Sequence, residues 1–231
     1  TVITDYRNNP PSFASLAPLL NWSAIKTSGL MHEKILLIDN DISFLGTANM
    51  TYESMKMHDN LILGFYSEKL NRFLQDYSKK IPLKRSFKNT TSELFNLGSQ
   101  TLELWMLPFK GSAPLERMVE IISKAQKSID ISIFTLTHPK ILNALIDAKK
   151  RGVHLRVFLD LTSAKGASSK AANMLADQAV PIFISQGIQL LHHKMMLVDK
   201  EIFVLGSANW TKSAFEKIMI FRSEEHTSEL Q

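Results

Sequence analysis

The second half of the chain alternates between the two periods that distinguish helices from strands. Apolar residues recur every three or four positions in some segments, which predicts amphipathic helices, and every second position in others, which predicts strands. Strands that alternate with helices favour a layered α/β sheet. In chain order, we expect a helix from about 112 to 125, a strand over 129–133, a helix from about 139 that Gly152 ends, a strand over 153–159, a helix over 169–177 and a strand over 181–184.

An internal repeat organises the whole chain. Residues 32–51 and 192–211 align without a gap, and both read H-x-K-x4-D-x6-G-[ST]-x-N-x-T. At roughly one in twenty per fixed position, even the six-residue core of this pattern is expected by chance only about once in ten million windows. The two copies start at residues 32 and 192, which is 160 residues apart, and they indicate a duplicated unit of domain size.

The two copies of the unit differ in extent. Val2–Asp5 matches Val157–Asp160, so the first copy begins at the counterpart of a late strand. We therefore expect its opening helix, first strand and second helix, about 45 residues, to be missing. The expected division is a first half over 1–78 (incomplete at its N-terminus), a basic linker over 79–111, a second half over 112–221 (incomplete at its C-terminus), and a tail over 222–231 that matches the conceptual translation of a common sequencing adapter and is set aside as non-native.

Composition narrows the class of protein only modestly. With 45% hydrophobic and 21% charged residues among 231, the chain can build one large or two small domains with a core. No apolar run is long enough for a membrane-spanning helix, and the absence of cysteine excludes disulfides and thiolate metal sites. The formal net charge of +5 suits an anionic partner, either a phospholipid surface or nucleic acid. The cellular location stays open, because the chain begins at Thr1 and a signal peptide can be neither recognised nor excluded.

Each copy of the motif predicts a β-hairpin that gathers polar groups at one end. Residues two apart on a strand project from the same face, so the His and the Lys of each motif point the same way. A tight turn and a returning strand then bring the Gly-[ST]-x-Asn segment back beside that pair. The groups expected to meet are an imidazole, an ammonium, a hydroxyl and an amide from each copy: His32, Lys34, Thr47 and Asn49, and His192, Lys194, Ser207 and Asn209.

This set of side chains suits the cleavage of a phosphodiester. Attack on the phosphorus builds charge on the non-bridging oxygens, which Lys and Asn donors can hold without a metal. One imidazole is a competent nucleophile near neutral pH, and a second one can protonate the leaving alkoxide. We therefore expect no cofactor and no metal. A zinc site made by His192 and His193 is disfavoured, because adjacent strand residues diverge.

At these residues the chain resembles the phospholipase D superfamily, which is known for paired H-x-K-x4-D motifs. The resemblance covers residues 1–217, and the second half is especially similar to bacterial endonuclease-type and mitochondrial cardiolipin-hydrolase-type members. Two motifs in one chain are more typical of the bacterial phospholipase D and cardiolipin synthase branches. The resemblance implies an α/β fold of two pseudo-symmetric α/β/α halves with mixed sheets, with the active site on the pseudo-two-fold axis. Because both motifs are in one chain, no obligate protein partner is expected.

The resemblance also implies a role for each motif residue. One His forms a phosphohistidine and the other acts as acid and then as base; by position His32 is the nucleophile, although the symmetric motif leaves the order open. The Lys and Asn residues grip the phosphate, and the motif aspartates Asp39 and Asp199 support the site. Family members place an acidic residue ten or eleven positions past the Asn, where it orients a His, and Asp59 occupies that place in the first half. The second half loses the match after Lys217.

The leading functional hypothesis is a phospholipase D-type hydrolase that releases the head group of a phospholipid and leaves phosphatidic acid. A second enzyme class is a nuclease acting on single-stranded or non-specific nucleic acid. A third is a phosphatidyltransferase of the cardiolipin synthase kind. From a different class, the chain could be a degenerate binding module, but binding alone does not require both histidines.

Overall fold

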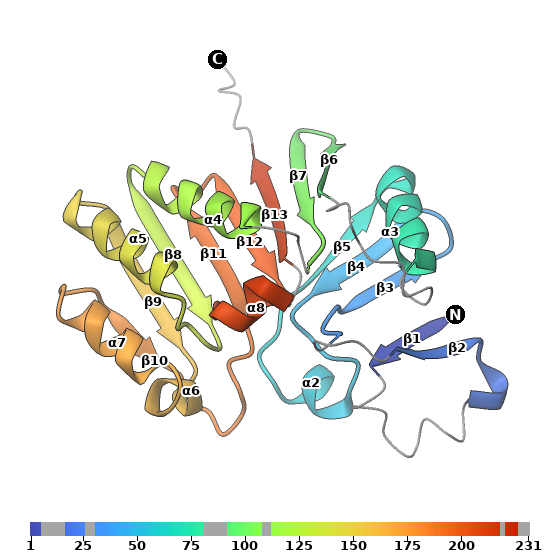
Figure 1. Ribbon diagram of the computed structural model, residues 1–231, viewed down its shortest axis with the longest axis horizontal. Helices are drawn as coiled ribbons and strands as arrows, with labels where there is room; N and C mark the ends of the chain where they lie inside the picture. The colour runs from blue at the N-terminus through green and yellow to red at the C-terminus, as the bar shows by residue number, and fades with distance from the viewer. Residues whose placement is uncertain (6–16, 26–30, 81–91, 108–111, 218–219, 226–231) are drawn as a thin grey trace.

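Two halves of mixed α/β structure lie side by side in the molecule (Figure 1). The second half contains the larger sheet and the longer series of helices, and the first half contains two smaller sheets. The computed structural model describes residues 1–5, 17–25, 31–80, 92–107, 112–217 and 220–225.

The large sheet combines parallel and antiparallel pairing around the second motif. Its order is β10-β9-β8-β11-β12-β13-β7-β6, and pairing is parallel among the first three strands and antiparallel from β8 onward. Helices α4 and α5 pack against each other, while α5 contacts β9 and α7 contacts β10. The elements of this half are α4 (Ala113–Lys124), β8 (Ser128–Ile133), α5 (Pro139–Lys150), β9 (His154–Leu159), α6 (Leu161–Lys165), α7 (Ser169–Ala176), β10 (Ile182–Ile184), β11 (Lys194–Val198), β12 (Ile202–Gly206), α8 (Lys212–Lys217) and β13 (Ile220–Glu225).

The first half holds its motif in a three-stranded antiparallel sheet of order β3-β4-β5. Helix α3 packs on β3 and β4 through its apolar face, where Leu70 and Leu74 are buried. A second, parallel sheet pairs β1 with β2. The elements are β1 (Val2–Asp5), η2 (Ala17–Leu19), β2 (Trp22–Ile25), β3 (Ile35–Ile38), β4 (Ile42–Gly46), α2 (Tyr52–Lys56), β5 (Ile62–Tyr66) and α3 (Glu68–Lys80).

The strands of the two halves correspond at the spacing of the sequence repeat. The parallel pair β1–β2 matches the parallel pair β9–β10, and the hairpin β3–β4 matches the hairpin β11–β12. In the second half β8 lies between these two pairs and joins them into one sheet. Among residues 1–78 no described strand takes that place, so the two pairs stay in separate sheets. The expected α/β class with two related halves is confirmed.

The segment that we expected to be a linker, 79–111, contains a β-hairpin. Strands β6 (Ser92–Leu97) and β7 (Gln100–Trp105) pair with each other across a turn in which Gly98 has a φ of 68°, and they form the end of the large sheet. Their apolar residues Phe95, Leu102 and Leu104 are buried in the core. Alternate apolar positions therefore make this segment part of the fold. The basic residues Lys84, Arg85 and Lys88 lie outside the described residues.

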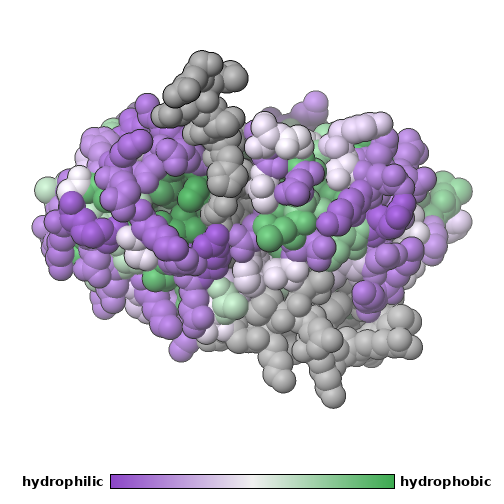
Figure 2. All heavy atoms as spheres, turned by 90° about the horizontal axis from the view of Figure 1, so that it is seen from above, coloured by the Kyte–Doolittle hydropathy of each residue, from purple (hydrophilic) through white to green (hydrophobic). Residues whose placement is uncertain are grey.

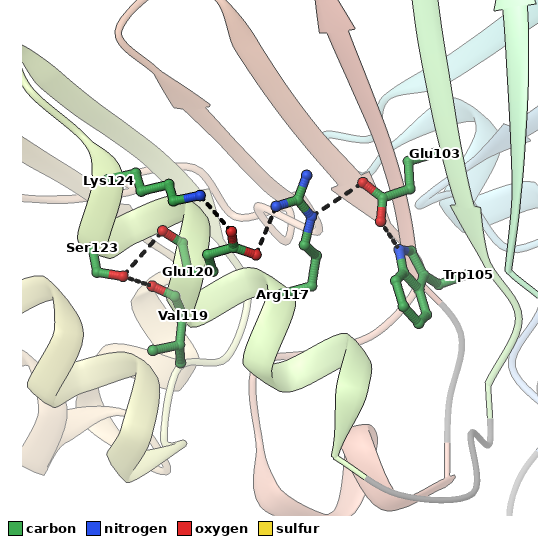
Figure 3. A network of polar contacts seen from close by, with 7 residues as sticks. All are labelled: Glu103, Trp105, Arg117, Val119, Glu120, Ser123 and Lys124. Carbon is green, nitrogen blue, oxygen red and sulfur yellow. Dashed lines mark hydrogen bonds and ion pairs between the residues drawn. The ribbon is translucent and has the colours of Figure 1, made fainter.

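A polar network attaches this hairpin to the second half (Figure 3). Nε1 of Trp105 donates to Oε1 of Glu103 at 2.8 Å, and Nε of Arg117 on α4 donates to Oε2 of Glu103 at 3.2 Å. The same guanidinium donates to Glu120 at 2.7 Å, and Lys124 donates to the other oxygen of Glu120 at 2.6 Å. The chain of charges runs from β7 to the end of α4, so it fixes the position of the hairpin beside that helix.

Residues 222–225, within the tail that we set aside, form the last part of strand β13. The backbone of β13 pairs with β12 on one side and β7 on the other. This pairing uses the N–H and C=O groups that nearly every residue carries, and therefore requires no particular side chains. Residues 226–231 lie outside the described residues.

One hydrophobic core extends through both halves. It includes Ile131 and Val157 of the large sheet, Leu70 of α3 and Leu45 of the first motif hairpin. Strand β12 also contacts β4 directly. Because the two hairpins share this core, their polar ends are held next to each other.

Candidate active site

The histidine of the second motif reaches into the first half of the molecule. Nδ1 of His192 lies 3.1 Å from the carbonyl oxygen of Thr47 and 3.1 Å from Oδ1 of Asn60. The ring of His32 has the equivalent contact, because the backbone of Ser207 is hydrogen-bonded to it and raises its pKa. Each motif His therefore faces the Gly-[ST] segment of the other copy.

The two histidines and the two lysines influence one another electrostatically. Burial lowers the pKa of His32 to about 3, and Lys34, Lys194 and His192 lower it as well. Burial also lowers the pKa of His192 to about 3, with Lys194, Lys34 and His58 adding to the effect. Mutual influence of this kind requires the groups to lie close together. The structure thus brings both motifs to one site, with both imidazoles neutral at pH 7.

Both motif lysines are buried and are held by the same local hydrogen bond. Nζ of Lys34 donates to the carbonyl oxygen of His32 at 2.6 Å, and Nζ of Lys194 donates to that of His192 at 2.7 Å. Burial lowers the pKa of Lys34 to about 7, although nearby Glu33 raises it. Burial, and then Lys34, lower the pKa of Lys194 well below its ordinary value. Burial and mutual repulsion disfavour the protonated forms of these two amines, so a bound anion, which stabilises both charges, is strongly favoured.

The amide of Asn60 fixes the orientation of the His192 ring. Its Nδ2 donates to the carbonyl oxygen of Ser54 at 2.8 Å, so Oδ1 must face the other way. There Oδ1 accepts a hydrogen bond from the Thr47 hydroxyl at 2.9 Å and lies beside Nδ1 of His192. Both neighbours of Nδ1 are acceptors, so Nδ1 carries the hydrogen and Nε2 of the neutral ring has a free lone pair. Asn60 was not among the residues that we predicted.

The hydroxyl and amide groups of the motif differ in whether the protein already occupies them with hydrogen bonds. The Thr47 hydroxyl is buried and is already used, because it accepts from the amide of Leu61 at 3.0 Å and donates to Asn60. Ser207 is buried at the equivalent position. Oδ1 of Asn209 is buried without a hydrogen-bond partner among the described residues. We predicted phosphate binding by both hydroxyls and both amides, and the Thr47 hydroxyl instead supports the site from within.

The motif aspartates lie at the opposite end of the hairpins. Asp39 and Asp199 open the turns, with φ of 52° and 56°. Five strand residues separate Asp199 from His193, which at about 3.3 Å per residue is more than 15 Å. The carboxylate of Asp199 accepts from the backbone amides of Gln126, Lys127 and Ser128 at 2.7–2.8 Å. The structure does not bring these aspartates to the site, and Asp199 ties the hairpin to the start of β8.

Asp59 supports the site through its backbone. Its N–H donates to the carbonyl oxygen of Leu190 at 2.9 Å, and its C=O accepts from the amide of His192 at 2.8 Å. Burial lowers the pKa of His193, and the nearby carboxylate of Asp59 opposes that shift. The side chain of His193 points to β8, with Nδ1 3.0 Å from Oγ of Ser132. The residue that orients a motif His is therefore Asn60, eleven positions past Asn49, and not Asp59.

Two buried aspartates that sequence reasoning did not select position the motif histidines. Oδ2 of Asp5 accepts from the amide of Met31 at 3.0 Å, and Oδ2 of Asp160 accepts from the amide of Leu191 at 3.0 Å. Each amide belongs to the residue just before a motif His. The signal was present in the sequence, because Asp5 and Asp160 end the two matching strands.

No group of three or more His, Cys, Asp or Glu side chains among the described residues could hold a metal ion. None of the described helices combines the length and apolarity needed to cross a bilayer.

Comparison with known proteins agrees with this architecture. The chain matches the family described as "Cardiolipin synthase, PLD-like domain" over residues 9–81 and 118–230. It is 32% identical over 108 residues to mitochondrial cardiolipin hydrolase of Xenopus tropicalis (47% of this chain, 50% of that protein) and 33% identical over 97 residues to phospholipase D of Rickettsia prowazekii (42% and 47%). The chain thus spans about half the length of the curated relatives it matches.

A solved structure shares the fold at low sequence identity. Phosphatidylserine synthase of Haemophilus influenzae superposes with a TM-score of 0.63 at 11% identity, over 84% of this chain and 57% of that one. At that identity the likeness concerns the fold alone. The family match covers most of the chain, includes both motifs and agrees with the two-halved fold. This chain belongs to the phospholipase D superfamily, in the family of cardiolipin synthase, PLD-like domains.

Proposed function

We propose that this protein is a phospholipase D-type phosphodiesterase that hydrolyses the head-group phosphodiester of phospholipids through a phosphohistidine intermediate. The observation that carries the proposal is the meeting of His32, His192 and two buried lysines at one place between the halves. Relatives named phospholipase D and cardiolipin hydrolase support a lipid as the substrate.

His192 is the better candidate for the nucleophile. Its Nδ1 hydrogen is donated to Thr47 and Asn60, which leaves Nε2 with a lone pair. The ring of His32 has the backbone of Ser207 as its partner but, among the described residues, no side-chain acceptor like Asn60 beside Nδ1. This order is the reverse of the one that the family resemblance suggests by position.

The reaction then proceeds in two displacements. Nε2 of His192 attacks the phosphorus, the bond from phosphorus to the head-group oxygen breaks, and protonated His32 gives its proton to the leaving alkoxide. His32 next removes a proton from water, the hydroxide oxygen attacks the phosphorus, and the P–N bond breaks. The products are the head-group alcohol and phosphatidic acid, and both histidines return to their starting states.

The low pKa values of the histidines suit a site that is activated by its substrate. In the free site the pKa of His32 is about 3, so the acid form is scarce at pH 7. A bound phosphodiester anion offsets the neighbouring lysines and stabilises a protonated imidazole. Lys34, Lys194, Asn49 and Asn209 are the groups that we assign to the phosphate, while Asp199 fixes the turn of its hairpin and the backbone of Asp59 fixes the segment before His192.

The test compares wild type with His192→Ala and His32→Ala on two substrates. Release of choline or ethanolamine from vesicles is measured beside cleavage of single-stranded DNA. Either substitution is expected to lower lipid turnover by roughly 1000-fold or more. Undiminished turnover by His192→Ala would exclude the two-histidine mechanism. DNA cleavage without lipid turnover would contradict the phospholipase D activity and support a nuclease.

The identity of the nucleophile requires a different substrate. A diester with a p-nitrophenolate leaving group departs without help from an acid. With this substrate, His32→Ala is expected to accumulate a phosphohistidine on residue 192, detectable by mass spectrometry, whereas His192→Ala forms none. The opposite pattern would assign the nucleophile to His32.

Nuclease and phosphatidyltransferase activities use the same displacement at phosphorus. The net charge of +5 suits a nucleic acid as well as an anionic phospholipid surface, so the assay with DNA decides between the two. A phosphatidyltransferase differs only in the acceptor, since an alcohol replaces water in the second displacement. Adding glycerol to the vesicle assay distinguishes a transferase from a hydrolase, because a transferase forms phosphatidylglycerol in place of phosphatidic acid.

A further inference from the structure

His193, the middle residue of the second motif, is half-buried between the two halves of the molecule. Hydrophilic residues cover most of the outer surface that is seen from above in Figure 2, so a polar side chain that lies inside needs partners there. Because neighbouring strand residues project to opposite faces, its ring lies away from the side chains of His192 and Lys194. The two displacements at phosphorus give His193 no part, and its contacts indicate a different role.

The ring of His193 joins a strand of the second half to a backbone segment of the first. Its Nδ1 lies 3.0 Å from the hydroxyl oxygen of Ser132 on β8. The ring is also hydrogen-bonded to the backbone of Asn60, and this contact raises the pKa of His193. A contact that raises the pKa favours the charged ring, which has donors only. The group of Asn60 that meets the ring is therefore its carbonyl oxygen.

A neutral ring suits both neighbours of His193. Burial lowers its pKa below the ordinary value, and the carboxylate of Asp59 opposes that shift. A neutral imidazole has one donor nitrogen and one acceptor nitrogen. A carbonyl oxygen accepts and a hydroxyl group can do either, so the backbone of Asn60 and the side chain of Ser132 together match the two nitrogens. The ring thus connects the halves without adding a positive charge beside Lys194.

The connection ends on the residue that orients His192. The side chain of Asn60 is held by its own half, because Nδ2 donates to the carbonyl oxygen of Ser54 at 2.8 Å and Oδ1 accepts from the Thr47 hydroxyl at 2.9 Å. Nδ1 of His192, 3.1 Å from Oδ1 of Asn60, belongs to the other half. The distance between these two atoms therefore depends on how firmly the backbone of Asn60 is attached to the second half, and His193 supplies such an attachment.

Backbone pairing across the halves stops just before this point. The N–H of Asp59 donates to the carbonyl oxygen of Leu190 at 2.9 Å, and the amide of His192 donates to the carbonyl oxygen of Asp59 at 2.8 Å. These bonds form an isolated parallel bridge of one residue pair. In the next peptide group, the N–H of Leu61 donates to the Thr47 hydroxyl of the first half at 3.0 Å. The carbonyl oxygen of that group is the one that His193 holds from the second half.

The two copies of the motif differ at this middle position. The first copy has Glu33, and Oη of Tyr77 on α3 lies 3.5 Å from its Oε1, within the same half. The H-x-K pattern leaves the residue type at this position free. The contact of His193 with the opposite half is therefore a property of the second copy in this chain and not of the motif pattern.

We propose that His193 is a positioning residue, which holds Asn60 beside His192 and so keeps the hydrogen of the His192 ring on Nδ1. This inference rests on the proposed function, because a nucleophile that attacks through Nε2 needs that tautomer. Without the connection, the neutral ring of His192 can carry its hydrogen on either nitrogen. Fewer molecules then have a lone pair on Nε2. The rate of the chemical step falls, while the groups that we assign to the phosphate are unchanged.

The experiment measures the tautomer separately from catalysis. The variants are His193→Ala and His193→Gln, and the matched control is His154→Ala, an exposed histidine on β9. Nitrogen-15 NMR of the histidine rings at pH 7 shows which nitrogen of His192 carries the hydrogen, with His192→Ala used to assign the signals. The kcat and KM are measured on a short-chain monomeric phospholipid, and circular dichroism checks the fold.

His193→Ala is expected to give a mixture of His192 tautomers, to lower kcat roughly 10-fold and to keep KM within about threefold. The amide of His193→Gln can donate to a carbonyl oxygen and accept from a hydroxyl, so this variant should keep the hydrogen on Nδ1 and recover kcat to within about threefold of wild type. The control should match wild type. If His193→Ala does not fold, Ser132→Ala replaces it, with a smaller change in the same direction.

An unchanged His192 tautomer in His193→Ala would overturn the positioning role, and so would a loss that appears in KM alone. Equal losses of kcat in the Ala and Gln variants would also overturn it, because the hydrogen bonds would then not be the cause. If the wild type turns over no phospholipid, the proposed function fails, and the NMR signals of His192 still decide whether His193 sets the tautomer.

Discussion

At the scale of single residues, an uncharged amide lies beside the imidazole of the second motif. Asn60 lies beside Nδ1 of His192, and its own orientation is fixed by Ser54. An amide orients the ring without adding charge, so the pKa of His192 stays low, at about 3. A carboxylate at the same place would favour the protonated ring and raise that pKa.

We therefore predict different effects for two substitutions of Asn60. Asn60→Ala releases the ring and is expected to lower kcat by roughly 10- to 100-fold. Asn60→Asp keeps the acceptor but raises the pKa of His192, so the acidic limb of the pH–rate profile moves to higher pH. The measurement is kcat/KM against pH, with Asn96→Ala on β6 as a matched exposed control. An unchanged acidic limb in Asn60→Asp would contradict this role.

At the scale of elements, the two ends of each motif hairpin differ: one end holds the side chains of the candidate site, and the other is a turn that holds the motif Asp. Its open end carries the motif His and Lys, and its turn carries the motif Asp of each copy. The turn of the second hairpin is fixed by three hydrogen bonds from the loop before β8 to Asp199. No such bond to the side chain of Asp39 occurs among the described residues of the first half.

The two motif aspartates should consequently differ in their effect on stability. Asp199→Ala leaves three backbone amides without their acceptor and is expected to cost about 1–3 kcal/mol of the free energy of unfolding. Asp39→Ala is expected to cost less, about 0.5–1 kcal/mol, because it removes no side-chain hydrogen bond among the described residues and only places Ala at a φ of 52°. Urea unfolding measures both values, and the kcat of the folded fraction should stay within about threefold for each. A large loss of kcat in folded Asp199→Ala would restore a catalytic role to the turn.

At the scale of the whole molecule, the packing of the two halves buries two lysines whose charges destabilise the folded state unless an anion is bound. Lys34 and Lys194 are buried near each other, and burial lowers the pKa of Lys34 to about 7. A lysine whose pKa is lower in the folded state binds fewer protons there than in the unfolded chain between about pH 7 and 10.5. Its contribution to stability therefore rises with pH across that window and is unfavourable below it.

We predict that inorganic phosphate stabilises the protein and that Lys34→Met removes this effect. Phosphate should raise the Tm at pH 7 by several degrees more than chloride at equal ionic strength, because it binds between the lysines only in the folded state. Lys34→Met should raise the Tm in chloride, since the buried charge is gone, and should respond little to phosphate. Differential scanning calorimetry measures each case, with the exposed Lys140→Met as control. An equal phosphate response in Lys34→Met and wild type would refute the anion site.

The sequence alone was enough to predict the repeat, the two motif hairpins and the His and Lys residues that meet at the candidate site. The pairing of His32 with Lys34, and of His192 with Lys194, follows from strand geometry, because alternate residues share a face. The helices and strands of the second half agree with the structure to within a few residues at their ends, since their periods are local properties of the chain.

The tertiary structure decided everything that depends on contacts between distant segments. Asn60 acquires its role only because the fold brings it next to a ring 132 residues further along the chain. The hairpin over 92–105 was taken for part of a linker, because its burial depends on α3 and β13 and not on its own composition. Local spacing specifies which side chains share a face, but only packing of the two halves specifies which groups those side chains meet, because that choice is made by the shared core.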